Sequence, residues 1–557
     1  MADKRIDIYL GATSMRTCLG DKVETLDAMR NGISGLKYSD EFAMHVGRSK
    51  VKMINKFTRF ESFMIEQIRN VVAESGIDMS DDDVQLIVST TKGNIDYLAA
   101  DCENFADEVF IDSSVQSVAD FFRCKNKPII ISNACISGVS AFVVARWMLL
   151  SAKCKHVVLV GCDALCEFIT SGFASFKSIS QGPCRPYDEN RDGLTLGEAA
   201  GAVLLTTDVA MADSARIRFA GGAVSNDANH ISGPSRTGDG LYYAVSHAMN
   251  EAHVKSEDIG FLNTHGTATR YNDEMESKAV AWAELNDKPL NSLKGYIGHT
   301  LGASGVVETI VCAEQLKQSY IFGTKGHSVS DTPHKLSLSS DLQHFKKKCC
   351  VKTASGFGGC NAAIVLDMEA QRNKTTRPQD HKTTKVLGEV VTEYSLPQSD
   401  LPFAEFIRNE FKSFGESNMK FYKMSDMSKA LYVAVEHLLK EDGFSDVEPS
   451  RRAIVLANKA ASLDADVIHQ EIINKRLPEG ASPAAFVYTL ANVAAGEICI
   501  RHKIQGDNTF FIEDEDSGLT EQYARSLIEN DRADAVICGW CEYLKGKWNV
   551  NIKLLKK

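Results

Sequence analysis

One cysteine stands out because of the segments on either side of it. Cys135 lies in Ile-Ser-Asn-Ala-Cys-Ile-Ser-Gly-Val, after an apolar run at residues 128–131 that is typical of a buried strand and before an amphipathic stretch at about residues 139–150. A thiol at such a strand-to-helix turn is close to the positive end of the helix and to free backbone amides, which favour the nucleophilic thiolate. The alternative, from position alone, is an inert buried cysteine, since the chain has 15 cysteines.

Three later segments carry residue types that could act beside this thiol. His265 follows a strand-like run in Asn-Thr-His-Gly-Thr-Ala-Thr, and His299 precedes a helical run in Lys-Gly-Tyr-Ile-Gly-His. Residues 355–361, Ser-Gly-Phe-Gly-Gly-Cys-Asn, form a loop that can bring backbone amides close to a ligand. Each segment alone is a weak signal, because a histidine at a strand end is more often structural than catalytic. Together, and in this order, they are a strong one.

Strand-like runs alternate with helical ones, which predicts a layered α/β fold. The expected strands include residues 6–10, 84–89, 156–161, 261–265 and 362–366. The expected helices include residues 61–73, 138–150, 241–252 and 304–318. Residues 369–385 are polar and lack apolar periodicity, so we interpret them as a linker that divides the chain near residue 377.

The composition limits the classes of function. The 557 residues suffice for three or four average domains, or for one double domain and a smaller one. A net charge of -11 argues against non-specific binding to nucleic acid. No stretch is long and apolar enough to cross a membrane, and the N-terminus lacks the apolar core of a signal peptide. The scattered cysteines show no short-spaced pairs, so we expect a cytoplasmic protein with free thiols and no metal site.

The region after the linker repeats features of the N-terminal part of the chain. A helical run that ends in Glu-Ser-Gly and a strand at residues 85–89 recur as a run that ends in Glu-Asp-Gly and a strand at residues 453–457. Ser-Gly-Val at residue 137 recurs as Ser-Gly-Leu at residue 517, and each is followed by a helix and a strand. Chance rarely gives several such elements in one order. In this imperfect copy the position of Cys135 falls on Glu515 or its neighbour, so the copy has no nucleophile.

The chemistry-bearing segments resemble those of the β-ketoacyl-[acyl-carrier-protein] synthases, the condensing enzymes of the thiolase-like superfamily. The resemblance covers about residues 6–366. The matching positions are Ala134 to Gly138, Thr264 to Thr267 with Asn272, Asp273 and Glu276, Lys294 with His299, Gly302 to Gly305 with Glu308, Gly356 to Asn361, Arg185 to Gly193, and Gly197 to Gly201.

This resemblance implies a thiolase-like α-β-α-β-α fold of two similar halves. Residues 1–210 would hold the nucleophile and residues 211–369 the two histidines. Residues 370–384 would form the linker, and residues 385–557 a third, degenerate copy of the N-terminal half. The segment from residue 91 to residue 127 is shorter than usual in the family, which leaves the standard homodimer and the control of chain length open.

The resemblance also implies an acyltransferase. It would join an acyl thioester to malonyl-[acyl-carrier protein] by decarboxylative Claisen condensation, giving 3-oxoacyl-[acyl-carrier protein] in fatty acid or polyketide and polyene biosynthesis. Cys135 would carry the acyl group as a thioester. His265 and His299, as neutral imidazoles, would donate to the malonyl thioester oxygen, each worth about 3–4 kcal/mol in the transition state. Lys294 would orient a histidine or tune its electrostatics.

Further roles follow from the same resemblance. The backbone N–H groups of Cys135 and Phe357 would form the oxyanion hole for acyl transfer, with Gly356 and Gly358 in the same gating loop. Three residues would support the site: Glu308, Asn361 and Thr267.

The expected partner is acyl carrier protein, which brings the phosphopantetheine, so no cofactor on the chain itself is expected. Its docking would need a basic patch, for which the candidates are Lys56, Arg59, Lys125 and Lys127; the alternative for each is a solvated charged face. We expect either a homodimer or an intramolecular pseudo-dimer through residues 385–557. In the pseudo-dimer the strand at residues 509–512 would be the counterpart of residues 128–131.

Two other functions fit the same fold. One is a malonyl decarboxylase or initiator, which the intact Cys135 argues against because such variants usually replace the nucleophile. The other is a non-catalytic partner subunit of a ketosynthase heterodimer, which suits the region after the linker better than the first 370 residues. Acyl chain length, saturation and pathway are left open by the sequence.

Overall fold

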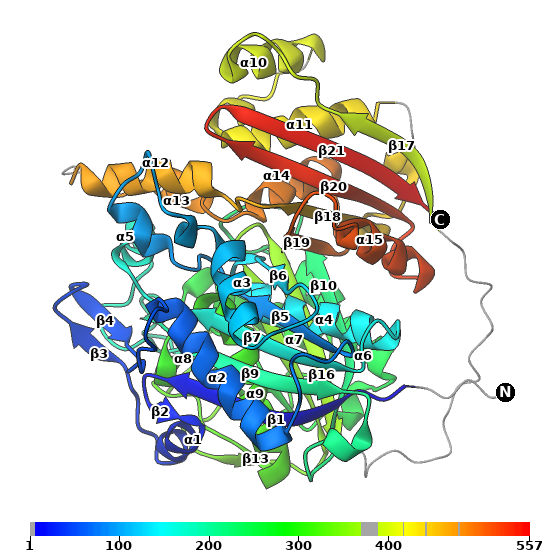
Figure 1. The fold of residues 1–557 in the computed structure, drawn as a ribbon. Coiled ribbons are helices and arrows are strands. Elements are labelled where there is room, and N and C mark those ends of the chain that lie inside the picture. The colour runs from blue at the N-terminus through cyan, green and yellow to red at the C-terminus, as the bar shows by residue number, and fades with distance from the viewer. Residues whose placement is uncertain (1–5, 369–387, 416, 441–442, 477–479) are drawn as a thin grey trace.

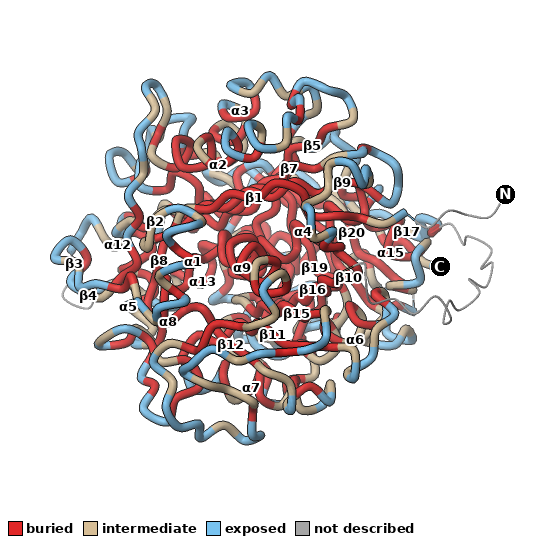
Figure 2. The backbone as a smooth tube through the Cα atoms, turned by 90° about the horizontal axis from the view of Figure 1, so that it is seen from below, coloured by how far each residue is buried: buried red, intermediate tan, exposed pale blue. Residues whose placement is uncertain are grey.

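The computed structural model describes residues 6–368, 388–415, 417–440, 443–476 and 480–557, so the predicted linker lies outside the described residues. Among these residues no helix is long and apolar enough to cross a membrane. The strands run in the order β12-β11-β15-β16-β10-β1-β9-β7-β5-β6-β19-β18-β20-β21-β17. Figure 1 shows the C-terminal strands, from β17 to β21, above the N-terminal ones, with β19 next to β6. Figure 2 shows the buried segments gathered in the centre and the exposed ones around them.

The N-terminal sheet has five strands in the order β1-β9-β7-β5-β6. They are β1 (Tyr9–Thr17), β5 (Val84–Ser89), β6 (Ile129–Ile131), β7 (His156–Asp163) and β9 (Ala199–Thr206). Helix α2 (Arg59–Ser75) packs on β1, β9 and β7, and α3 (Ile111–Phe121) packs on α2. Thr58 and Glu61 form a capping box at the start of α2, and Gly76 ends it with a φ of 70°.

A second sheet joins the first through one pair, Tyr9 opposite Arg218. Its strands are β10 (Ile217–Asn226), β11 (Phe261–Asn263), β12 (Leu290–Asn291), β15 (Cys349–Gly356) and β16 (Cys360–Met368). Helix α6 (Asp239–Ala252) packs on β10 and β16, with α7 (Arg270–Trp282) beside it.

Two helices lie between these sheets. Helix α4 (Ser137–Leu150) contacts β7 and β10, and α9 (Ser304–Gln318) contacts β9 and β15. The layers are therefore helix, sheet, helix, sheet and helix, which confirms the expected fold class. The expected amphipathic character of α4 was wrong: every residue from Ser137 to Leu149 is buried, because sheets cover the helix on both sides.

The C-terminal region contributes five strands to one end of the same continuous sheet. They are β17 (Glu389–Ser395), β18 (Arg452–Asn458), β19 (Asn508–Ile512), β20 (Ala535–Leu544) and β21 (Lys547–Lys556). The order β19-β18-β20-β21-β17 repeats β6-β5-β7-β9-β1, and neighbouring strands have the same relative directions in both sets. The helices of this region are α10 (Phe403–Ser413), α11 (Asp426–Leu438), α12 (Leu463–Asn474), α13 (Pro483–Val487), α14 (Val493–His502) and α15 (Leu519–Glu529).

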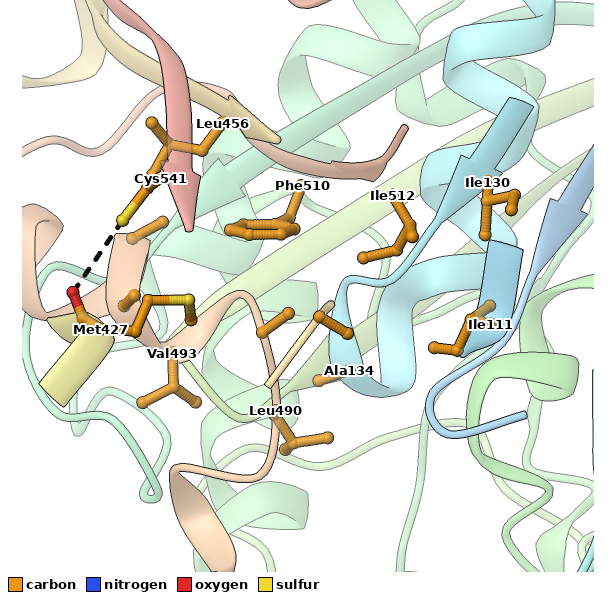
Figure 3. Packing of buried hydrophobic residues seen from close by; sticks show 14 of the residues in the cluster. Ile111, Ile130, Ala134, Met427, Leu456, Leu490, Val493, Phe510, Ile512 and Cys541 are labelled. Carbon is orange, nitrogen blue, oxygen red and sulfur yellow. Dashed lines mark hydrogen bonds between the residues drawn. The ribbon is translucent and has the colours of Figure 1, made fainter. Parts of the chain in front are cut away.

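The two five-stranded sets meet at a seam where β6 pairs antiparallel with β19. Phe511 lies opposite Ile131 and Ile512 opposite Ile130. The buried residues of both sides form one continuous core, in which Ile130 from β6 and Phe510 from β19 belong to the same cluster (Figure 3). The seam is thus an uninterrupted part of the hydrophobic core.

The remaining elements are short. They are β2 (Gly20–Asp21), α1 (Lys22–Arg30), β3 (Lys37–Ser39), β4 (Met44–Gly47), α5 (Glu167–Ser175), β8 (Leu196–Gly197), α8 (Lys294–Ile297), β13 (Tyr320–Ile321) and β14 (Gln343–His344). The predicted strand at residues 84–89 and helix at residues 304–318 have the predicted bounds. The first strand begins three residues later than expected, at Tyr9.

Candidate active site

Cys135 lies in a sharp turn between β6 and α4. The turn is a single 3-10 helix, Ala134–Ile136, and Ala134 has a φ of 47°, which is uncommon for a residue with a Cβ atom. The Ser137 hydroxyl accepts the backbone N–H of Asn133 (2.8 Å) and donates to the Ala134 carbonyl (2.6 Å). These hydrogen bonds hold the turn that presents the thiol at the start of the helix.

The structure brings the predicted cysteine and both histidines together. One donor atom from each of Cys135, His265 and His299 lies within 4.8 Å of the other two. The two imidazole rings meet edge to face, with their centroids 4.9 Å apart. All three side chains are buried. A reacting carbonyl at Cys135 would therefore be within reach of both rings.

Hydrogen bonds define the tautomer of His299. The backbone N–H of Leu301 donates to Nδ1 (3.2 Å), and Ser304 Oγ lies 3.1 Å from the same nitrogen. Because Nδ1 is an acceptor, the proton of the neutral ring is on Nε2. Nε2 is buried and has no hydrogen-bond partner among the described residues. This N–H is available to donate to an oxygen of a bound substrate.

A buried carboxylate fixes the backbone that carries His265. Glu276 accepts the backbone N–H groups of His265 (2.8 Å) and Gly266 (2.7 Å). The Tyr187 hydroxyl (2.8 Å) and the Asn272 side chain (2.9 Å) also donate to it. Glu276 therefore serves to hold the histidine loop against α7.

A second buried carboxylate lies between two lysines. Lys294 Nζ is 2.9 Å from one oxygen of Glu308, and Lys352 Nζ is 2.5 Å from the other. Burial opposes the charge of Glu308, but the two ammonium groups outweigh it and hold the pKa of this carboxyl below its ordinary value. Sequence analysis missed Lys352, although a single lysine within the apolar strand β15 was a signal of a buried charge.

The surroundings keep both histidines neutral. Burial, and next the ammonium group of Lys294, lower the pKa of His265 and of His299 well below the ordinary value. The sulfur and two nitrogens also form a donor set of the kind that zinc prefers. The positive charge of Lys294 opposes a divalent cation at this place.

The thiol itself differs from the expectation of a ready thiolate. Burial raises the pKa of Cys135 to about 12. Lys294 and the backbone N–H groups of Phe357 and Cys135 lower this pKa, but by less than burial raises it. The start of the helix does not by itself ionise a thiol that is closed off from water.

The predicted gating loop lies directly against the thiol. The backbone N–H groups of Phe357 and Cys135 lie near enough to the sulfur to lower the pKa of the thiol, and the oxyanion hole that they would form stays a prediction. A Cβ atom on Gly356 would lie 3.1 Å from the Cys135 backbone nitrogen, and Gly358 has a φ of 89°. Glycines are thus needed for the close approach and for the left-handed turn.

The predicted supporting residues hold neighbouring loops. Asn361 donates to Asp227 (2.8 Å) and accepts from Ser355 (2.7 Å), which ties together the two ends of the gating loop. Thr267 forms a hydrogen bond with the Thr269 hydroxyl (2.8 Å).

Residues of the C-terminal region also reach the site, and sequence analysis missed them. The side-chain amide of Asn492 donates to the Phe357 carbonyl (2.8 Å). The ring of Phe486 packs against Phe173 with centroids 5.2 Å apart, and Phe173 stacks on Phe357 at 6.0 Å. No motif marks Asn492 or Phe486, because their position depends on the pairing of the two sheets.

Three of the four cations expected to receive a carrier protein are paired with carboxylates, and the docking role stays a prediction. Arg59 pairs with the buried Glu198, with 2.8 Å between a guanidinium nitrogen and a carboxylate oxygen. The other pairs are Lys125 with Asp82 at 2.6 Å and Lys127 with Asp514 across the seam. Lys56 is exposed, with a φ of 71°.

A cavity of about 660 Å³ lies away from Cys135, within the C-terminal region. Helices α10, α11 and α14 end there, and Arg452 donates to three backbone carbonyls, those of Ser445, Val447 and His502. Arg452 thus serves helix and loop ends, while Arg501 and His502 pair with Glu436.

Family models match the region that contains the site. The N-terminal domain of β-ketoacyl synthases matches residues 19–210, and their C-terminal domain matches residues 216–326. The chain is 28% identical over 272 residues to the polyketide biosynthesis malonyl-ACP decarboxylase of Bacillus subtilis (46% of this chain, 65% of that protein). It is 32% identical over 254 residues to 3-oxoacyl-[acyl-carrier-protein] synthase 2 of Rhizobium meliloti (42% of this chain, 59% of that protein). The chain thus spans less than two thirds of either relative.

One solved structure is similar over nearly the whole chain. The PfaC keto synthase-chain length factor aligns with a TM-score of 0.78 and 14% identity, and the alignment covers 99% of this chain and 78% of that one. The likeness in fold therefore includes the C-terminal region. From the two domain matches and the motifs gathered around Cys135, we conclude that the chain belongs to the β-ketoacyl synthase family.

Proposed function

We propose that the chain is an active condensing enzyme that elongates an acyl thioester with malonyl-[acyl-carrier protein]. The observation that carries this proposal is the grouping of Cys135, His265 and His299 within 4.8 Å, with the His299 Nε2 proton free to donate. A thiol alone could transfer an acyl group. Two neutral imidazoles beside it are suited to stabilising an enolate oxygen as well.

In the first step, Cys135 Sγ attacks the carbonyl carbon of the acyl thioester. The N–H groups of Cys135 and Phe357 stabilise the oxyanion, and the carbon–sulfur bond to the carrier breaks. The thiol proton leaves with the carrier as its free thiol, and the acyl group remains on the enzyme. Burial raises the pKa of the thiol, so little thiolate is present before the substrate binds. The rate of acyl transfer therefore depends more on the hydrogen-bond donors at the oxyanion.

In the second step, the malonyl thioester loses carbon dioxide while both histidines donate to its thioester oxygen. The electron pair of the broken carbon–carbon bond becomes an enolate, whose carbon attacks the acyl group on Cys135. The carbon–sulfur bond to the enzyme then breaks, and the thiolate takes up one proton from water, which balances the negative charge brought in by the malonyl carboxylate. The product is a 3-oxoacyl thioester on the carrier.

The test measures three reactions on four proteins: acylation of the enzyme, carbon dioxide release from malonyl-carrier, and condensation. The wild type should form both a 3-oxoacyl product and an acyl-enzyme, and Cys135→Ala neither. His265→Ala and His299→Ala should retain some acyl-enzyme but release carbon dioxide from malonyl-carrier at least about a hundredfold more slowly. Condensation by Cys135→Ala at the wild-type rate would refute the proposal.

The second candidate is a malonyl decarboxylase or initiator that does not condense. The similarity to the Bacillus subtilis malonyl-ACP decarboxylase favours it. In the same assay this alternative predicts carbon dioxide release with an acetyl-carrier product, even when an acyl donor is present. The intact Cys135 favours condensation.

We further propose that residues 388–557 are a degenerate copy of the N-terminal half that takes the place of a partner subunit. The repeated strand order and the pairing of β6 with β19 support this intramolecular pseudo-dimer. The Lys127–Asp514 ion pair across the seam supports it too. In this arrangement one chain would need no separate partner subunit to complete the site.

A further inference from the structure

The space beside the thiol is very small. The cavity that Cys135 lines has a volume of about 20 Å³, close to the room needed for one water molecule. Its walls are apolar side chains, among them Ile169, Phe173 and Leu490, with Lys92 at its margin. An acyl chain on the sulfur must occupy this space or push a wall aside.

Part of the wall of this cavity, Phe486 and Leu490, comes from the C-terminal region. Phe486 in α13 is only 3% exposed and fits over Gly172 of α5 so closely that a Cβ atom there would lie 2.1 Å from its ring. The ring also contacts Phe173 and His469, with centroids 5.2 Å and 5.1 Å away. A side chain held on three sides in this way does not yield easily to a longer chain.

Beside this ring, the pocket's margin is closed by a buried ion pair. Lys92 Nζ lies 2.5 Å from a carboxylate oxygen of Asp466 in α12, and it also bonds Ser462 Oγ (3.1 Å) and the Thr489 carbonyl. Both charged side chains are about 5% exposed or less. A hydrocarbon tail that separated them would leave two unpaired charges away from water, which is strongly unfavourable.

We propose that the acyl pocket of Cys135 accepts only short acyl groups, and that Phe486 and the Lys92–Asp466 pair stop longer ones. This inference rests on the proposed function, because it specifies the substrate of the same site. The residues that would block longer chains come from both sides of the seam. Lys92 follows β5, whereas Phe486 and Asp466 belong to the C-terminal region.

The experiment uses the full chain and pantetheine thioesters of two, four, eight and twelve carbons, so that carrier docking plays no part. Acylation of Cys135 is followed by mass spectrometry of the intact protein. The wild type should react at least about tenfold faster with two and four carbons than with eight. Phe486→Ala should raise the ratio of the eight-carbon rate to the two-carbon rate by at least about tenfold.

Two further variants test the same idea in case Phe486→Ala does not fold, and a third variant is a control. Phe486→Leu removes less volume and should give a smaller shift in the same direction. The double variant Lys92→Met, Asp466→Leu replaces the pair with apolar side chains and should also admit longer chains. Ile468→Ala changes an exposed residue of α12 and should leave the length profile unchanged.

The inference is overturned if the wild type accepts eight or twelve carbons as fast as two. It is also overturned if Phe486→Leu and the double variant, both folded, leave the profile unaltered. If no thioester of any length acylates Cys135, the proposed function fails instead.

Discussion

The N-terminal and C-terminal sheets have the same five-strand order, but they differ at the turn after the strand that forms the seam. After β6, the left-handed Ala134 brings Cys135 to the start of α4. After β19, the corresponding segment carries Glu515, whose carboxylate accepts from Asn549 (2.8 Å) and Asn551 (2.9 Å) at the surface. The first turn points a nucleophile into the protein, and the second points an acid away from it.

What the two regions share is the packing. Both sheets contribute to the core that crosses the seam, and the C-terminal region sends Asn492 and Phe486 to the site that it does not itself repeat. The two regions thus keep the same strand order and share a core, while the candidate catalytic residues lie in one of them. In the proposal above, the C-terminal region acts by positioning and enclosing the site.

Removal of the C-terminal region should have the largest effect. A shortened chain of residues 1–370 would expose the edge of β6 and the apolar surface that now covers it. We expect light scattering to show a monomer for the intact chain and dimers or aggregates for the shortened one. An intact chain that dimerises by pairing two Cys135 strands directly would contradict the pseudo-dimer.

A single substitution at the seam should be strongly destabilising without removing the region. Phe511 is fully buried opposite Ile131, so Phe511→Ala should lower the free energy of unfolding by about 3–5 kcal/mol. Urea unfolding measures this, with Val391→Ala on the exposed strand β17 as the control. A change below about 1 kcal/mol would mean that the seam contributes little to stability.

The positive charge of Lys294 should set the pH dependence of decarboxylation. Burial and Lys294 depress the pKa of both imidazoles, so in the wild type the neutral rings persist below pH 6.5 and the rate should fall only in more acidic solution. Lys294→Met removes a positive neighbour, which makes the imidazolium form less unfavourable and raises both pKa values. The acid limb of carbon dioxide release should move to higher pH, with a rate at neutral pH reduced by about tenfold or more. An acid limb that stays in place would show that Lys294 does not tune the histidines.

Asn492 tests the contribution of the C-terminal region to the gating loop. Asn492→Ala removes the hydrogen bond to the Phe357 carbonyl and should lower kcat for acyl transfer by about three- to tenfold, with KM for the acyl thioester little changed. Asn492→Gln, which keeps the amide, should recover part of the loss. Equal losses in both variants together with a lower Tm would indicate a merely structural role.

Glu515 should matter least. Because its carboxylate lies at the surface and accepts from the side chains of Asn549 and Asn551 in β21, Glu515→Ala should leave condensation within about twofold of the wild type. A large loss of activity would mean that the second turn has kept a functional role.

The sequence predicted what lies close along the chain. Cys135, His265 and His299 could be predicted as site residues because each combines a reactive side chain with a turn. The repeat could be predicted because its elements recur in the same order. Lys352, Asn492 and Phe486 were missed because only the packing of separate elements brings them to the thiol. The raised pKa of Cys135 could not be predicted from the sequence either, because it depends on how completely the packed elements exclude water from the thiol.

The most direct test of the central claim is the mass of the intact protein after reaction with an acetyl thioester, followed by peptide mapping. The chain has 15 cysteines, and we predict one acetyl group per chain, located on the peptide that contains Cys135. Cys135→Ala should carry none. Acetylation at another cysteine, or an unchanged mass for the folded wild type, would contradict the account.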